Sequence, residues 1–360
     1  MRVQALSTLP WAVEEWDACC GDRDFYLSST WLTAAEATSE RPPSYFAAQD
    51  ESGRIVGATV GYFLGVDSPF SFCRPDNVMS ERTHRDARDG VLLGLMPSLS
   101  LGGRNPSHSR IAVSSGADRP QVMNLLVEAA EQEAVDRGAA TACLLFVEQE
   151  DEDLAKVLRV RGWRSEESEP AAVLDLMACA TYDDYLASLS SKRRETVRRD
   201  ERRLRQAGVS FEVRSLREAD VAAIVALEQG LYERHSTPYD AEMSTRLYRS
   251  LASAAAGEVY LSTATLQGDL VGFSLFFMRG EVVHARAVGI AYRTVGNLPV
   301  YFGSLYYSLI RFALSRGSTQ IRYSTGSEAV KVSRGCRLVA QRAYAWSIDP
   351  SRRALSRTLV

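Results

Sequence analysis

Two short segments of the chain, GRIVG at Gly53–Gly57 and GDLVG at Gly268–Gly272, share one pattern of glycine and apolar residues. Each segment leads into an apolar run, at 58–63 in the first half and at 273–278 in the second. Glycine gives a tight turn the backbone freedom that it needs, and an apolar run after a turn is typical of a β-strand. The two segments therefore predict a β-hairpin in each half and indicate an internal repeat.

The segments that follow the two hairpins also match in order. Each half has a helical pattern that ends at an Arg-Gly pair, a strand, a second helix that ends at an Arg-Gly pair, and a last strand. These segments are 125–138, 142–147, 161–162 and 171–177 in the first half, and 304–317, 320–324, 334–335 and 342–348 in the second. Glycine after the last turn ends a helix, and arginine in that turn suits the helix dipole. The pattern predicts an α/β fold of two tandem domains, each with a mixed sheet flanked by helices.

The length and composition agree with two globular domains. The 360 residues suit two domains of roughly equal size, which we expect at 1–178 and 179–360, the second opening with a basic helix over 186–207. Apolar residues make up 46% of the chain and charged residues 24%, which excludes a disordered protein. The net charge of −3 argues against a general nucleic-acid coat protein and leaves room for a local basic patch.

The sequence gives no sign of export, membrane insertion or metal binding. The first residues lack the apolar core of a signal peptide, and no run approaches the roughly 18 apolar residues of a spanning helix. Six cysteines without a CxxC pair are expected to be reduced thiols, and four histidines show no ligand spacing. We therefore expect a cytoplasmic protein without a metal site; the sequence leaves its oligomeric state open.

Three stretches resemble a known family. They are TYDDYLASLSSKRRETVRRDERRLRQAGV at 181–209, YYSLIRFALSRG at 306–317 and GSEAVKVSRG at 326–335. Their order is similar to the Fem-like, peptidoglycan biosynthesis/recognition branch of the GNAT acyltransferases, and the likeness in layout covers nearly the whole chain. The resemblance implies a tandem GNAT fold in which one half does the chemistry. Relatives named Fem use aminoacyl-tRNA as donor, whereas others use acyl-CoA or a carrier-protein thioester.

The resemblance assigns donor binding to the loop 290–299. In GNAT enzymes, backbone N–H groups of this loop and of the next helix start hold a pyrophosphate. Arg293 and Gly296 fit the family pattern, but its second glycine is missing. Either Arg293, Gly296 and Asn297 bind the donor, or the loop is an ordinary one in which Asn297 caps a helix with Pro299 in its first turn.

The corresponding segment of the first half fits donor binding less well. A strand is expected there at 111–115, and Asp118 follows near a helix start, where it would repel a phosphate. We therefore expect the second half to be catalytic and the first half to support it.

Two pairs of polar residues are the candidates for chemistry. His284 and Arg286 alternate on the expected strand 282–289 and so face one side, either as part of a polar cleft with His284 catalytic and Arg286 binding the acceptor, or as a hydrogen-bonded core pair. Glu328 and Lys331 are three residues apart on one helical face. Glu328 is the candidate base, or else a carboxylate favoured by the helix dipole. Lys331 binds a phosphate or carboxylate of the substrate, or else pairs with Glu328.

Several aromatic and basic residues are candidates for the acceptor pocket. Tyr307 and Tyr323 either line the cleft or belong to the core. Tyr232, His235 and Tyr239 gather where a helix gives way to a loop, and loops carry specificity.

The basic run 192–205 holds eight basic residues against three carboxylates. Arg198, Arg199 and Arg202 either contact the phosphates of tRNA, or belong to a solvated helix with pairs such as Glu195 with Arg199. The run has no aromatic residue for base stacking, which argues against binding of a single strand.

The sequence thus predicts an N-acyltransferase that moves an acyl or aminoacyl group to an amine of a small-molecule, cell-wall or peptide-like acceptor by direct attack. The donor is an acyl thioester on CoA or on a carrier protein, or alternatively aminoacyl-tRNA as in Fem enzymes. Relatives of this kind serve cell-wall or specialised-metabolite pathways. Two other classes remain open: a non-catalytic binding protein on the GNAT fold, and a tRNA-binding accessory protein.

Overall fold

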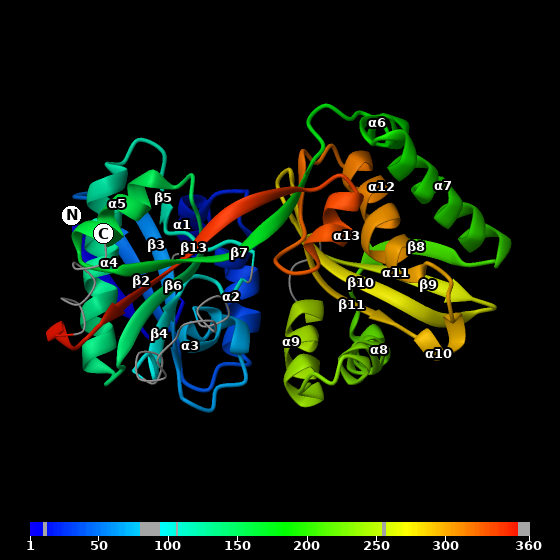
Figure 1. The fold of residues 1–360 in the computed structure, drawn as a ribbon. Coiled ribbons are helices and arrows are strands. Elements are labelled where there is room, and N and C mark those ends of the chain that lie inside the picture. Colours follow the sequence, from blue (N-terminus) through cyan, green and yellow to red (C-terminus); the bar gives the residue numbers. More distant parts are fainter. Residues whose placement is uncertain (10–12, 80–93, 106, 254–256, 352–360) are drawn as a thin grey trace. The chain divides into compact units, whose positions relative to one another are not determined.

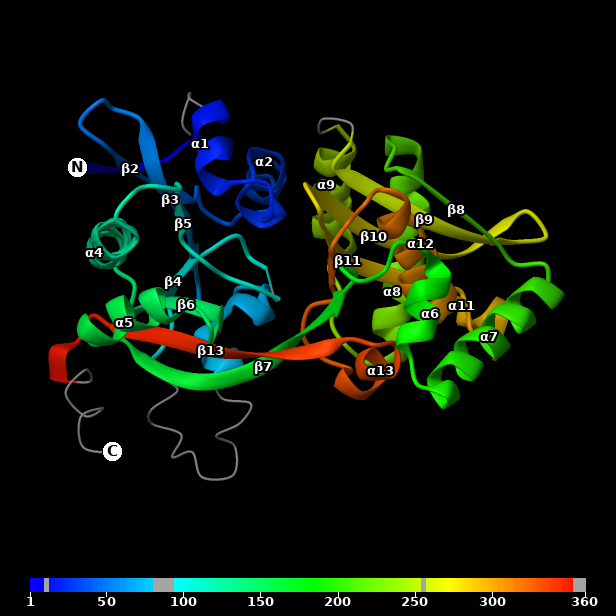
Figure 2. The same ribbon diagram turned by 90° about the horizontal axis from the view of Figure 1, so that it is seen from above.

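The computed structural model describes residues 1–9, 13–79, 94–105, 107–253 and 257–351. The chain forms two compact units: unit 1 is Met1–Ala171 with Val339–Val360, and unit 2 is Ala172–Leu338. In each unit, helices pack on a mixed β-sheet (Figures 1 and 2). The predicted α/β class is thereby confirmed.

Unit 1 has the strand order β1-β2-β3-β4-β6-β13-β7. Its strands are β1 (Arg2–Leu6), β2 (Ser44–Gln49), β3 (Ile55–Leu64), β4 (Ser98–Leu101), β6 (Thr141–Glu148), β7 (Arg164–Asp175) and β13 (Arg337–Ser347), with β5 (Ala112–Val113) beside β3. Its helices are α1 (Val13–Cys20), α2 (Ser29–Glu36), α3 (Pro75–Val78), α4 (Arg119–Asp136) and α5 (Glu152–Val160). The pair β4-β6 is parallel, whereas β2-β3 and β3-β4 are antiparallel.

Unit 2 has the strand order β7-β12-β11-β10-β9-β8. Its own strands are β8 (Ser210–Ser215), β9 (Val259–Leu266), β10 (Asp269–Arg279), β11 (Val282–Ile290) and β12 (Gln320–Arg322). Its helices are α6 (Tyr182–Ser188), α7 (Ser191–Gln206), α8 (Val221–Arg234), α9 (Ala241–Ser253), α10 (Tyr292–Val295), α11 (Val300–Phe302), a π-helical turn (Gly303–Tyr307), α12 (Ser308–Ser315) and α13 (Glu328–Ser333). Helices α8 and α9 lie on one face of this sheet, and α6, α7 and α12 lie on the other (Figures 1 and 2).

The two glycine motifs have the same structural reason in both halves. Gly53 and Gly268 have φ values of +85° and +93°, which a residue with a side chain rarely adopts, and they form the turns before β3 and β10. A Cβ on Gly57 would lie 2.2 Å from Val122 of α4, and one on Gly272 would lie 2.9 Å from Val300 of α11. The second glycine therefore lets a helix pack closely on the strand.

The last strand of each half completes the sheet of the other half. Residues 173–175 of β7 pair antiparallel with β12 of unit 2, and β13 pairs antiparallel with β6 of unit 1. The units therefore differ from the continuous ranges 1–178 and 179–360, because 339–360 returns to unit 1. A sequence pattern indicates that a strand exists but not which strand it pairs with.

Two expected elements differ from the structure. The strand that matches β11 in the first half is β4, because β4 pairs parallel with β6 as β11 does with β12. The expected strand 111–115 is instead the short β5 at the side of β3. The expected helix 186–207 is broken, since Leu189 has an extended backbone (φ −81°, ψ 149°) that separates α6 from α7.

Within the described residues, no helix is long and apolar enough to cross a membrane. The same residues hold no group of three or more His, Cys, Asp and Glu side chains placed to bind a metal ion.

Candidate active site in unit 2

The sheet of unit 2 opens between β11 and β12. The two strands pair in parallel only over Val282–His284 and Gln320–Arg322. After Arg322 the chain stays beside β7, because Tyr323 N donates to Ala172 O of β7 at 2.8 Å. Strand β11 continues alone on this side to Ile290. The opening therefore starts directly after His284.

The corresponding place in unit 1 is bridged by its own chain. Beyond the last pair of β4 and β6, Leu101 with Leu144, Ser109 N donates to Phe146 O at 3.0 Å. Gln341 Nε2 donates to the carbonyl oxygens of Ser107 and Phe146 at 2.7 and 3.2 Å. These bonds join the two sides of the gap, so the sheet of unit 1 is bridged at the place where the sheet of unit 2 opens.

A β-bulge lies two residues after the start of the unit 2 opening. In the ladder with β10, Phe276 faces Ala285 and Leu275 faces Ala287, so Arg286 is the extra residue. A bulge disrupts the local ladder and re-aims backbone groups, and bulges are frequent beside active sites. A backbone N–H at such a place is suited to stabilise a developing oxyanion.

The polar residues of β11 face helix α8. Val283 and Ala285 belong to the hydrophobic cluster that also contains Leu309 of α12. Strand alternation puts His284 on the opposite face, where Arg286 also lies because its charge acts on Glu228 of α8. This confirms that His284 and Arg286 share one side of the strand.

Glu228 is the centre of a buried polar cluster on that face. Its Oε2 atom accepts hydrogen bonds from the hydroxyls of Tyr239 (2.8 Å) and Tyr248 (2.6 Å). The side chain is 7% exposed, and burial raises the pKa of the Glu228 carboxyl above its ordinary value, while the two hydrogen bonds and Arg286 oppose the rise. A carboxyl group whose pKa is raised in this way is better suited to receive a proton than an ordinary glutamate.

Tight packing fixes Glu228 relative to the strand. A Cβ on Gly289 of β11 would lie 2.6 Å from the Leu227 carbonyl carbon and 2.7 Å from the Glu228 nitrogen. Helix α8 can therefore approach β11 backbone to backbone only because position 289 is glycine. The carboxyl of Glu228 is consequently held on the rigid part of the sheet.

Three of the predicted acceptor residues meet in this cluster. The ring centroids of Tyr232 and Tyr239 lie 4.9 Å apart. The charges of Glu228 and Arg286 also act on the pKa of Tyr232. His235 lies at the exposed end of α8, outside the cluster. Sequence reasoning missed Glu228 itself, because a single glutamate on an amphipathic helix reads as a solvated residue.

The loop predicted to bind the donor is closed by its own hydrogen bonds. Backbone N–H groups of residues 294, 295, 296, 298, 300 and 303 all donate to carbonyl oxygens between 291 and 299. Arg293, Gly296 and Asn297 are exposed, and Asn297 O accepts from Arg203 of α7 at 2.7 Å. The N-cap of α11 is Pro299, without a side-chain cap, so the alternative in which Asn297 caps this helix is wrong.

The residues after β12 form a tight loop under Lys331. Lys331 Nζ donates to Ser324 O at 2.9 Å and Thr325 O at 2.6 Å, and Lys331 is 5% exposed. Glu328 lies exposed in the first turn of α13, as its helix-dipole alternative predicts. Tyr323 is buried and stacks on Tyr306 with ring centroids 4.8 Å apart. The geometry thus gives Lys331 a role in holding this loop beside the opening.

Tyr307 belongs to a different buried cluster, which joins three helical segments. Its hydroxyl donates to Asp200 Oδ2 of α7 at 2.7 Å and accepts from Arg334 Nε at 3.1 Å. Arg334 Nη2 donates to the same Asp200 oxygen at 3.1 Å, and its guanidinium lies 4.0 Å from the ring centroid of Phe302. This cluster fixes α7 to the C-terminal end of α13.

Helix α7 presents its arginines outward and most of its carboxylates inward. Arg198, Arg199 and Arg202 are exposed, whereas Asp200 is buried against Arg334 and Glu201 is bound by Arg311 at 2.6 Å. The exposed Glu195 pairs with Arg202 at 2.7 Å, not with Arg199 as the i,i+4 spacing predicts. The outward surface is therefore strongly basic.

Comparison with known proteins identifies the family of this chain. Residues 105–358 match the FemAB-like family, described as peptidoglycan biosynthesis/recognition. That match covers more than half of the chain, so the protein belongs to the FemAB-like family, as the three motifs predict. Among curated proteins, none has a matching sequence.

Solved structures with little sequence identity share the fold. FemX is 12% identical with a TM-score of 0.69, and the match covers 99% of both chains. A tandem GNAT protein from the clavulanic acid biosynthesis pathway is 13% identical with a TM-score of 0.54, covering 97% of this chain and 99% of that one. L-PGS from Bacillus licheniformis is 10% identical with a TM-score of 0.53, covering 93% and 95%. These matches confirm the tandem GNAT fold.

Proposed function

We propose that this protein transfers an aminoacyl group from aminoacyl-tRNA to an amine of a peptide-like acceptor. The main support for this proposal is the outward surface of α7, where arginines are exposed and two of the three carboxylates are held inward. Such a surface attracts phosphate groups in the absence of sequence readout. The FemAB-like family and its link with peptidoglycan biosynthesis support an RNA donor and a cell-wall peptide acceptor.

The loop 291–299 argues against free acyl-CoA as donor. A pyrophosphate cradle needs several backbone N–H groups that are free to point at the anion. Four of the eight N–H groups of this loop, those of residues 294, 295, 296 and 298, are bonded within it, and the second family glycine is missing. An acyl thioester of CoA or of a carrier protein is therefore our second candidate, favoured by the exposed Arg293 and Gly296 alone.

The chemistry that we propose uses the opening after His284. The acceptor nitrogen attacks the ester carbonyl carbon, forming a C–N bond, and the ribose oxygen of the tRNA leaves with the electrons of the C–O bond. Glu228 takes the proton from the attacking amine, directly or through water, and that proton is returned to the leaving oxygen. The backbone at the Arg286 bulge stabilises the oxyanion, and Tyr232 and Tyr239 bind the acceptor.

Three roles that the sequence assigns are revised in this proposal. His284 is a residue of the polar face, and its catalytic role stays a prediction. Lys331, which the sequence assigns to substrate binding or to a pair with Glu328, is the group that holds the adjacent loop. Glu228 replaces Glu328 as the base, because Glu228 is buried in the polar cluster on the β11 face, whereas Glu328 is exposed on α13.

Calorimetry with acetyl-CoA, uncharged tRNA and aminoacyl-tRNA at about 50 and 200 mM salt tests the donor. We expect aminoacyl-tRNA to bind, with an affinity that falls with salt, and neutralisation of Arg198, Arg199 and Arg202 to reduce the salt slope by about 2 to 3. Micromolar binding of acetyl-CoA without tRNA binding would instead support the thioester donor. Binding of a peptide acceptor without any turnover of a charged donor would point to a binding protein.

A further inference from the structure

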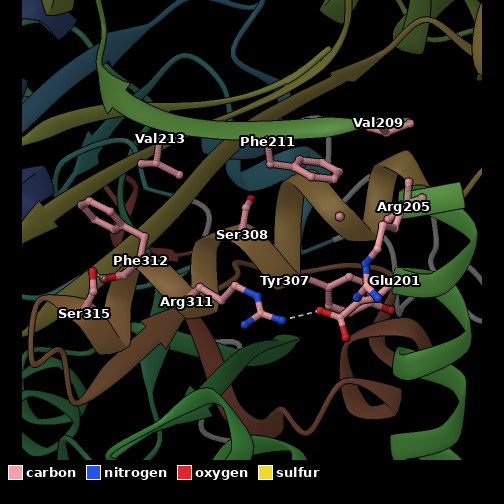
Figure 3. A pocket seen from close by; sticks show the side chains of 12 residues that line it. Glu201, Arg205, Val209, Phe211, Val213, Tyr307, Ser308, Arg311, Phe312 and Ser315 are labelled. Atoms are coloured by element: carbon pink, nitrogen blue, oxygen red, sulfur yellow. Dashed lines mark hydrogen bonds and ion pairs between the residues drawn. The ribbon is translucent and has the colours of Figure 1, made fainter. Parts of the chain in front are cut away.

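A groove of about 540 Å³ lies between α7, β8 and α12, on the face of the sheet opposite Glu228. Figure 3 shows Phe211 and Val213 of β8 on one side, Ser308 and Phe312 of α12 on the other, and Arg205 of α7 at one end. The groove contains none of the residues of the opening between β11 and β12. A volume of this size accommodates a small organic ligand or part of a larger one.

Two half-buried aromatic rings that line the groove are held in place by packing. A Cβ on Gly303 would lie 2.3 Å from the Phe211 ring, so that ring occupies the space that glycine leaves. The Phe312 ring contacts Tyr260 and Phe276, with centroid distances of 4.7 and 5.2 Å. The groove therefore offers rigid aromatic surfaces at little entropic cost to a ligand.

Arginines lead from the outward surface of α7 into this groove. Arg198, Arg202 and Arg205 are spaced i, i+4 and i+7, so they form one row along the helix that ends at the groove. Arg311 stands at the rim, bound to Glu201 and placed over the Tyr182 ring at 3.5 Å from its centroid. A nucleic-acid backbone whose phosphates bind along this row would place its next nucleotide at the two phenyl rings.

We propose that the groove binds an unpaired nucleotide of the donor RNA, with its base against Phe211 or Phe312 and its phosphates along the arginine row. The basic run of the sequence has no aromatic residue, but the fold supplies the stacking surfaces from β8 and α12. Aromatic stacking combined with arginine contacts to the backbone is the usual way to hold a single strand. An apolar chain would not need the arginine row, and an inorganic anion would not need the rings. This inference rests on the proposed RNA donor.

The test uses the full-length protein and a short single-stranded RNA with 2-aminopurine at one position, whose fluorescence is quenched on stacking. We expect quenching on binding, and the double variant F211L/F312L to remove most of the quenching and to weaken binding by about tenfold. Ser315 is exposed at the groove, so S315E should weaken binding without loss of fold. R246Q, which removes an exposed arginine of α9 on the other face of the sheet, is the matched control and should change nothing.

Different experimental results would refute the groove proposal and the proposal of an RNA donor. If intact aminoacyl-tRNA binds and is turned over but F211L/F312L and S315E have no effect, the groove proposal is overturned and the donor stands. The same holds if an abasic RNA loses as much affinity as the base-bearing RNA on F211L/F312L substitution. If neither RNA nor tRNA binds at low salt, the donor itself is refuted.

Discussion

Asp200 and Glu195 lie on the same helix, and each binds an arginine, but in opposite environments. Asp200 binds Arg334, and their side chains are 7% and 6% exposed, whereas Glu195 and Arg202 are 62% and 52% exposed. The substitution D200A leaves a buried guanidinium without its carboxylate. The matched substitution E195A leaves an arginine that water solvates.

The expected cost of D200A follows from the contacts that Arg334 keeps. Removal of one partner of a buried ion pair costs about 3–5 kcal/mol. Arg334 retains hydrogen bonds to the Tyr307 hydroxyl (3.1 Å) and to Ser333 Oγ (2.8 Å), and it stays over the Phe302 ring. We therefore expect the lower end, about 3 kcal/mol of unfolding free energy. E195A should cause no resolvable change, because an exposed pair is screened by solvent and salt.

Urea denaturation can locate this loss in one unit. All five tryptophans of the chain lie in residues of unit 1, so tryptophan fluorescence follows unit 1 while far-UV circular dichroism follows both units. D200A should lower the urea midpoint seen by circular dichroism more than the midpoint seen by fluorescence, at low and at high salt. Equal losses in D200A and E195A, or a loss seen first by fluorescence, would refute the assignment of Asp200 to a buried network of unit 2.

Four further predictions concern the opening and its surroundings. E228Q should lower kcat/KM at least 100-fold with tRNA binding intact, since a proton acceptor is lost. In the wild type, kcat/KM should rise as pH rises through the raised pKa of Glu228. A pH profile of kcat/KM that is the same in E228Q as in the wild type would exclude Glu228 as the base. The raised pKa of Glu228 gives a contribution to the unfolding free energy that is fully present below the unfolded value of about 4.3 and is lost as pH rises through the folded value, so E228Q should remove this contribution in pH-dependent denaturation. G289A should lower the unfolding free energy by about 1–3 kcal/mol, because its Cβ meets the backbone of α8. In the control G230A the Cβ meets nothing within 4 Å, so this variant should raise the unfolding free energy by about 0.5–1 kcal/mol. Equal effects of the two variants would contradict the close approach of α8 to β11. K331M should cost about 1–3 kcal/mol in chemical denaturation, because the carbonyl oxygens of Ser324 and Thr325 lose a donor, and no loss would show that the loop holds itself.

Local signals allowed much of the fold to be predicted. The turns at Gly53 and Gly268 and the Arg-Gly helix ends are set by backbone conformation, which neighbouring residues determine. The prediction of a strand at 111–115 in place of β4 is wrong, because a run of four residues, Ser98–Leu101, is too short for a clear periodic pattern. The exchange of β7 and β13 was not predicted, because partners far apart in the sequence leave no local signal.

The candidate site could be predicted only in part for the same reason. His284 and Arg286 were found because polar residues in an apolar strand are unusual. Glu228 was missed since its burial depends on the close approach of α8 to Gly289, which is a tertiary contact. The two rings of the groove, Phe211 and Phe312, are about a hundred residues apart in the sequence, and only the fold brings them to the basic helix.

The position of β13 late in the chain limits the order in which the two units can fold during synthesis. Unit 1 needs β13 beside β6, yet β13 is synthesised only after nearly all of unit 2 has been synthesised. The first half must therefore wait with an open sheet edge while the second half folds, a state in which unpaired strands are prone to wrong partners. The late arrival of β13 makes the completion of unit 1 depend on the synthesis of unit 2.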